Sequence, residues 1–71
     1  MTLLDAHVNS TYIIEKIEGG EKIKDFLFTL GCFEDEEITV ISNLGSNIIV
    51  NIKDGRYAID LQVAQSIFLY D

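Results

Sequence analysis

The sequence predicts a mainly β protein with one α-helix, built as a small barrel of about five antiparallel strands with a short helical turn before the last strand. Apolar residues recur at helical spacing over one stretch only, residues 21–30, and short β-branched and aromatic segments surround it. Asp54-Gly55 adds a tight turn between two of those segments. Closure into a barrel is expected because short strands in an open sheet would expose their edges.

The first strand and the helix are expected next to each other near the N-terminus. Residues 11–17, TYIIEKI, are β-branched and aromatic, and Gly19-Gly20 ends this strand. A helix is expected over residues 21–30, because one of its faces would carry the apolar residues Ile23, Phe26, Leu27 and Leu30. Gly31 suits the left-handed conformation that often follows a helix. A helix of about ten residues is marginal alone, so its apolar face is expected to dock onto the sheet.

Four more strands are expected in the rest of the chain, at residues 37–42, 47–52, 56–60 and 66–70. Asp54-Gly55 would supply the positive φ angles of a two-residue type I′ turn and so join the second and third of these strands in a hairpin. A second turn is expected at residues 43–46. One helical turn at residues 61–65 would lead to the last strand.

Length and composition limit what kind of protein this can be. The 71 residues suffice for one domain, residues 1–71, with a thin core. A single cysteine and a single histidine provide neither a disulfide nor a zinc site within one chain. No stretch approaches the roughly 18 apolar residues of a membrane span. The N-terminus lacks a basic segment before an apolar run, so a cytoplasmic protein without membrane insertion is expected.

The charge balance points away from nucleic acids. Twelve acidic residues against five basic ones give a net charge of −7, which repels phosphate backbones and anionic lipids. The imbalance is steeper after Phe33, where seven acids face two bases, than before it, where five face three. The C-terminal half therefore favours a basic partner surface.

The candidate reactive groups do not form a catalytic set. The acidic run from Glu34 to Glu37 lacks the spaced oxygen ligands and turn glycine of a calcium loop, so it is interpreted as a solvated joint between helix and strand. Cys32 lies beside these acids, which disfavour a thiolate, and is expected to be a packing residue. His7 stands alone in an N-terminal segment expected to be mobile. Catalytic, cofactor and metal residues are therefore not assigned, and a non-enzymatic binding protein is expected.

Several dispersed residues, in this order of elements, match a known pattern at Leu27, Leu30, Gly31, Leu44, Gly45, Ile48, Ala64 and Ile67. The chain resembles the FeoA family of ferrous iron transport proteins over nearly all its length. It departs from the family pattern at Glu34-Asp35, where Pro-Gly is usual, at Ser46-Asn47, where Asp-Pro is usual, and at Asp60, where arginine is usual. Phe26 also stands where a basic residue is common in the family, so the resemblance leaves a surface position open for it. The resemblance implies an SH3-like barrel in a cytoplasmic accessory protein of ferrous iron uptake. Its implied partner is the cytosolic GTP-binding domain of a FeoB-type transporter.

The candidate partner-contact residues are Phe28, Phe33, Glu34, Asp35 and Glu36. Phe28 falls off the predicted apolar face and Phe33 follows the helix end, although both could equally pack in the core. Two alternatives stay open. One is a module that responds weakly to transition metals through the acidic segment 34–37. The other is a self-associating structural domain, a weak homo-oligomer, whose apolar last strand pairs with a copy of itself.

Overall fold

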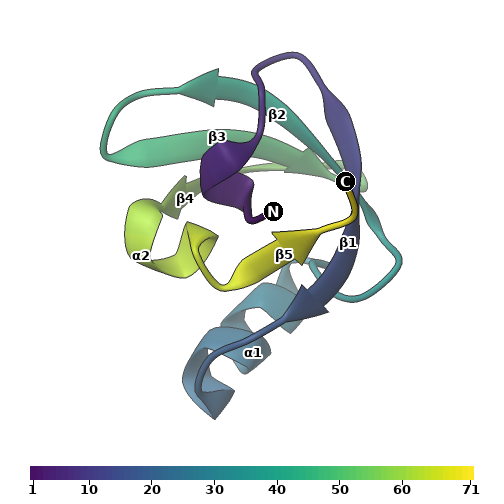
Figure 1. Cartoon of the computed structure of the whole chain (residues 1–71). Coiled ribbons are helices and arrows are strands. Elements are labelled where there is room, and N and C mark those ends of the chain that lie inside the picture. Colours follow the sequence, from purple (N-terminus) through teal and green to yellow (C-terminus); the bar gives the residue numbers. More distant parts are fainter.

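The computed structural model describes residues 1–71 as five strands, two α-helices and an N-terminal 3-10 helix (Figure 1). In chain order these are η1 (Leu3–Asp5), β1 (Thr11–Ile17), α1 (Glu21–Thr29), β2 (Glu37–Asn43), β3 (Asn47–Ile52), β4 (Gly55–Asp60), α2 (Leu61–Ala64) and β5 (Ile67–Leu69). The strands pair antiparallel in the order β4-β3-β2-β1-β5. The predicted mainly β fold, with a short helix before the last strand, is confirmed.

The sheet curls around a single apolar core, and α2 carries the chain from one edge strand, β4, to the other, β5 (Figure 1). Strand β3 shows the alternation that this requires, because Ile48, Val50 and Ile52 are buried while the residues between them are partly exposed. The core consists of the buried apolar residues Leu3, Ile14, Leu27, Cys32, Ile38, Val40, Ile48, Val50, Ile52, Ile59, Ala64, Ile67 and Leu69.

The N-terminal segment is part of the fold, which corrects the expectation that it is mobile. Leu3 is fully buried. The Thr2 hydroxyl accepts a hydrogen bond from the Leu4 N–H at 3.2 Å, and the Asp5 carboxylate accepts one from the Thr2 N–H at 3.0 Å. These two bonds cap η1 and hold Leu3 toward the core.

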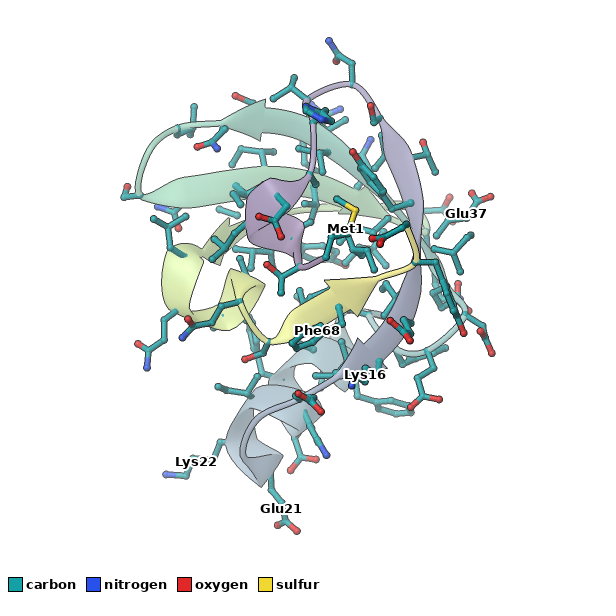
Figure 2. All side chains as sticks on the ribbon, viewed as in Figure 1. Met1, Lys16, Glu21, Lys22, Glu37 and Phe68 are labelled. Carbon is teal, nitrogen blue, oxygen red and sulfur yellow. The ribbon has the colours of Figure 1, made fainter.

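The same segment covers the outer edge of β5. The Leu69 N–H donates to the Met1 carbonyl at 2.8 Å, and Thr2 forms an isolated antiparallel bridge with Phe68. Figure 2 shows Met1 above the β5 ribbon, on the opposite side from α1. Strand β5 is therefore paired with β1 on one side and with the N-terminus on the other.

The hairpin between β3 and β4 is present as predicted, but its turn differs from the prediction. Ile52 pairs with Gly55, so the two loop residues are Lys53 and Asp54. Lys53 has a positive φ of 53°, whereas Asp54 and Gly55 do not, so the prediction of a type I′ turn at Asp54-Gly55 is wrong. Glycine is needed at position 55 because a side chain there would collide with the Tyr57 ring: a Cβ atom would lie 2.7 Å from its Cε2.

Helix α1 projects away from the curled sheet (Figure 1). Of its residues only Leu27 is buried, and Ile23 is half-buried. Phe26 is 48% exposed, which corrects the place on the docked face expected from its spacing and agrees with the surface position that the family resemblance left open. Leu27 joins the core, and Ile23 and Leu30 pack partly against it, so the predicted apolar face is only partly covered. Neither α1 nor α2 has the length and apolar character of a membrane-spanning helix.

The C-terminal end of α1 follows the prediction closely. Gly31 is left-handed with φ of 85°. The Gly31 N–H donates to the Phe28 carbonyl at 3.0 Å, and the Cys32 N–H donates to the Leu27 carbonyl at 2.9 Å. This pair of bonds is the Schellman motif, completed by the burial of both Leu27 and Cys32. It directs the chain sharply back to the sheet after Leu30.

Candidate partner-binding site

Two aromatic side chains stand together where α1 ends. Phe28 lies in the last turn of the helix and is 67% exposed, while Phe33 follows the Schellman motif and is half-buried. Their ring centroids are 5.3 Å apart with a tilt of 37°, a favourable geometry for two aromatic rings. We call Phe28 and Phe33 the aromatic pair. The reversal of the chain at Gly31 brings the two rings together.

The aromatic pair is a wall shared by two surface hollows. The helix-side hollow, of about 370 Å³, is lined by Ile17, Lys24, Phe28, Cys32, Phe33 and Glu34. The turn-side hollow, of about 590 Å³, lies between the end of α1 and the β3–β4 turn, where Ile52, Lys53 and Tyr57 contribute to its lining. Both hollows combine apolar walls with a few charged groups, as ligand and peptide sites commonly do.

A third hollow, of about 390 Å³, is lined by polar and charged residues only. Its walls are Asp35, Glu36, Glu37, Thr39, Asn51 and Lys53, and we call it the acidic hollow. Three carboxylates and one ammonium give it a formal charge of −3 + 1 = −2. Lys53 also lines the turn-side hollow, so the aromatic and acidic surfaces adjoin each other.

Lys53 connects the β3–β4 turn to the joint between α1 and β2. Its Nζ lies 3.1 Å from Glu36 Oε1 and 5.4 Å from the centroid of the Phe33 ring. Its Cδ and Cε atoms pack over Gly31, where a Cβ would meet them at 3.0 Å. The side chains of Lys53 and Glu36 are 52% and 30% exposed, so solvent screens the pair and its ionic contribution is small, and the packing of the lysine stem is its main structural effect.

The acidic joint is tied to the sheet by its backbone, and the side chains of Glu34, Asp35 and Glu37 are exposed while Glu36 is half-buried. The Asp35 N–H donates to the Ile14 carbonyl at 2.8 Å, and the Ile14 N–H donates to the Glu36 carbonyl at 2.9 Å. Asp35 has a φ of 69°, a conformation that aspartate tolerates better than most residues. Three of the carboxylates line the acidic hollow, but no three acidic, histidine or cysteine side chains come together in a way that could hold a metal ion.

Cys32 and His7 occupy contrasting environments. Burial raises the pKa of the Cys32 thiol from 9.0 to about 12, because the interior disfavours the charged thiolate. The thiol therefore remains protonated and packs in the core, as expected from the sequence. His7 is exposed on the connection between η1 and β1, and its backbone N–H donates to the Tyr12 hydroxyl at 2.8 Å.

The family of the chain is decided by the comparison with protein-family models. The model of the FeoA domain matches residues 1–71. The chain belongs to the FeoA family. This confirms the resemblance noted in the sequence, and it identifies the chain as a non-catalytic accessory domain linked to ferrous iron transport.

Solved structures share the fold of this FeoA-family chain. An iron uptake regulatory protein, FeoA, superposes with a TM-score of 0.89 at 21% identity, covering 97% of this chain and 93% of the other. FeoA of Stenotrophomonas maltophilia, crystallised with zinc and described as an SH3 domain protein, gives 0.86 at 20% identity, covering 99% and 89%. A manganese-dependent transcriptional repressor gives 0.88 at 17% identity, covering 97% of this chain but 40% of the repressor. These matches establish the SH3-like fold. No curated protein sequence matches the chain.

The structure divides the predicted contact residues between adjoining hollows. Phe28, Phe33 and Glu34 line the helix-side hollow, while Asp35 and Glu36 line the acidic hollow. The exposure of Phe28 excludes the alternative that it packs in the core.

Sequence reasoning missed other residues that line the same surface, among them Ile17, Lys24, Lys53 and Tyr57. The predicted hairpin placed Lys53 near a turn, and exposed turns often carry binding residues, so the sequence pointed to Lys53 only in part. The sequence did not show which turn folds toward the end of α1, because that depends on how far the sheet curls.

Proposed function

We propose that this FeoA-family protein is a non-enzymatic cytoplasmic accessory protein of ferrous iron uptake. In this proposal it docks on the cytosolic GTP-binding domain of a FeoB-type transporter and modulates transport. Family membership supports the proposal, because it implies association with the Feo ferrous iron transport system. The proposed contact residues are Phe28, Phe33, Glu34, Asp35 and Glu36.

The observation that carries the proposal is the exposed aromatic pair between two hollows. Single exposed apolar residues are common and need no explanation. Two adjacent, tilted rings that wall a pair of partly apolar hollows are a different case, since their burial by a partner would contribute several times the free energy of an average surface contact. A modulator needs such a surface and does not need a catalytic group.

The two alternatives gain no support from the geometry. A metal-responsive role would need carboxylates of residues 34–37 close enough together to bind one ion. Asp35, Glu36 and Glu37 line one hollow, but no three acidic, histidine or cysteine side chains come together in a way that could hold a metal ion. Self-association through the last strand would need a free edge on β5. That edge is occupied by the N-terminal segment, through the Leu69–Met1 hydrogen bond and the Thr2–Phe68 bridge.

The proposal is tested by ferrous uptake into vesicles that contain the purified transporter. Adding this protein should change the uptake rate in a saturable way. The Phe28→Ala variant should require about tenfold more protein for the same effect, because it removes an exposed contact ring. Phe26→Ala is the matched control, since it makes the same change on the same helix outside the hollows. An uptake rate that stays constant at every concentration of the protein would refute the proposal.

A further inference from the structure

Building on the proposed function, we infer the chemistry of the segment that this surface recognises. It is a short partner segment in which an apolar side chain is accompanied by a nearby lysine or arginine. The apolar side chain packs against the aromatic pair, and the basic group enters the acidic hollow. The inference rests on the apolar hollows, on the charge beside them, and on their shared walls.

The apolar half of the surface is unpartnered in this chain. Phe28 has two-thirds of its side chain in solvent, and Cys32 and Ile17 provide apolar wall on the helix side of it. The turn side adds Ile52 and Tyr57. An aliphatic or aromatic side chain seated in either hollow would remove apolar surface from water on both partners.

The charged half of the surface favours a lysine or arginine on the partner, next to the apolar side chain. Glu36 is already paired with Lys53, so Asp35 and Glu37 carry the uncompensated charge of the acidic hollow. Glu34 lines the helix-side hollow together with Lys24, so the charges there balance and the uncompensated negative charge lies in the acidic hollow. An ammonium or guanidinium group placed there gains charge-assisted hydrogen bonds, whereas an acidic segment is repelled.

Shared walls make these hollows one surface. Phe33 borders both the helix-side and the turn-side hollows, and Lys53 borders both the turn-side and the acidic hollows. One short segment can therefore contact the aromatic pair and the free carboxylates together. A second copy of this chain is a poor occupant, because both copies would carry a net charge of −7.

The inference is tested by two titrations, one with a fluorescent peptide of alternating lysine and leucine and one with the transporter's cytosolic GTP-binding domain. Control peptides replace every lysine with glutamate or every leucine with serine. We expect the lysine–leucine peptide alone to bind, and to bind several-fold more weakly when salt is raised from about 0.05 to 0.5 M.

Four variants of the protein separate the two halves of the surface. Phe28→Ala should weaken both titrations about tenfold, and Phe26→Ala should leave them unchanged. Asp35→Asn should weaken both about threefold or more, because it removes a free carboxylate while asparagine tolerates the left-handed backbone. Glu21→Gln makes the same charge change at the far tip of α1, well away from Glu37 (Figure 2), and should have no effect.

The outcomes distinguish this inference from the function on which it rests. If the transporter domain binds but Asp35→Asn behaves like Glu21→Gln in both titrations, the inference is wrong and the proposed function stands. If the lysine–leucine peptide shows the expected dependence and the transporter domain does not bind, the surface chemistry stands and the proposed partner is wrong. Equal binding of the lysine and glutamate peptides also overturns the inference.

Discussion

At the scale of single residues, Gly31 and Lys53 determine where the aromatic pair stands. Gly31 takes the left-handed conformation that reverses the chain, and the stem of Lys53 packs on the space that a side chain at Gly31 would fill. The role of Gly31 could be predicted, because helix ends have a local signature. The role of Lys53 could not, since its contacts come from a turn that is distant in sequence.

Gly31→Ala should lower the free energy of unfolding by about 1–3 kcal/mol, through left-handed strain and displacement of the Lys53 stem. Gly45→Ala is the matched control. Gly45 has a similar φ of 91° but open space around it, so strain alone should cost about 1 kcal/mol. Urea denaturation of both variants measures the difference. An equal decrease in the free energy of unfolding for both variants would show that the contact of Gly31 with Lys53 contributes nothing to stability.

The buried thiol of Cys32 is expected to make the stability of the protein depend on pH in the alkaline range. The folded-state pKa of about 12 exceeds the ordinary value of 9.0, so between these values the unfolded chain loses the thiol proton and the folded chain keeps it. The contribution of Cys32 to stability is therefore complete below pH 9 and declines as the pH rises toward 12. The stability difference between the native protein and Cys32→Ala should shrink over that range in urea denaturation. A constant difference would contradict the burial of the thiol.

At the scale of elements, the periodicity of apolar residues identified the helix and the strands, but it did not predict how much of the helix is buried against the sheet. The spacing of Ile23, Leu27 and Leu30 predicted α1, and the structure has it at Glu21–Thr29. The same spacing assigned Phe26 to the buried face, and this was wrong because α1 projects from the sheet, so that Leu27 is buried and Ile23 packs partly against the core while Phe26 stays exposed. A periodic pattern defines a face without stating how much of that face is covered.

Asp60 acquires a structural role at this scale, although it departs from the arginine expected of the family. Its carboxylate accepts a hydrogen bond from the Val63 N–H at 2.8 Å and so caps the N-terminus of α2. Asp60→Ala should cost about 1 kcal/mol of stability, whereas Asp60→Asn should cost only a few tenths because asparagine also caps helices. Thermal denaturation of the two variants compares them. If Asp60→Ala is as stable as Asp60→Asn, the Asp60 carboxylate does not stabilise the start of α2.

At the scale of the whole molecule, a thin core is completed by the N-terminal segment. Chains of this size have a total stability of about 4–10 kcal/mol, so each fully buried side chain contributes a large share. Length, composition and strand pattern predicted the curled antiparallel sheet. They did not predict that residues before β1 fold over the edge of β5, because a run as short as Leu3-Leu4 has no measurable period.

Leu3 and Leu4 give a matched test of that observation. Leu3 is fully buried and Leu4 is 44% exposed. Leu3→Ala should lower the free energy of unfolding by about 2–5 kcal/mol, because it leaves a cavity in the core, while Leu4→Ala should change it by less than about 1 kcal/mol. Chemical denaturation measures both. Similar small effects would mean that the N-terminal segment is not part of the core.

The most direct test of the central claim is a titration of isotope-labelled protein with the transporter's cytosolic GTP-binding domain, following each backbone amide signal. We expect the shifts to cluster at residues 28–37 and at the β3–β4 turn around Lys53, with the signals of α2 unchanged. Shifts confined to another face, or a spectrum that does not change at saturating transporter domain, would contradict the proposal that the aromatic pair and the acidic hollow form the docking surface.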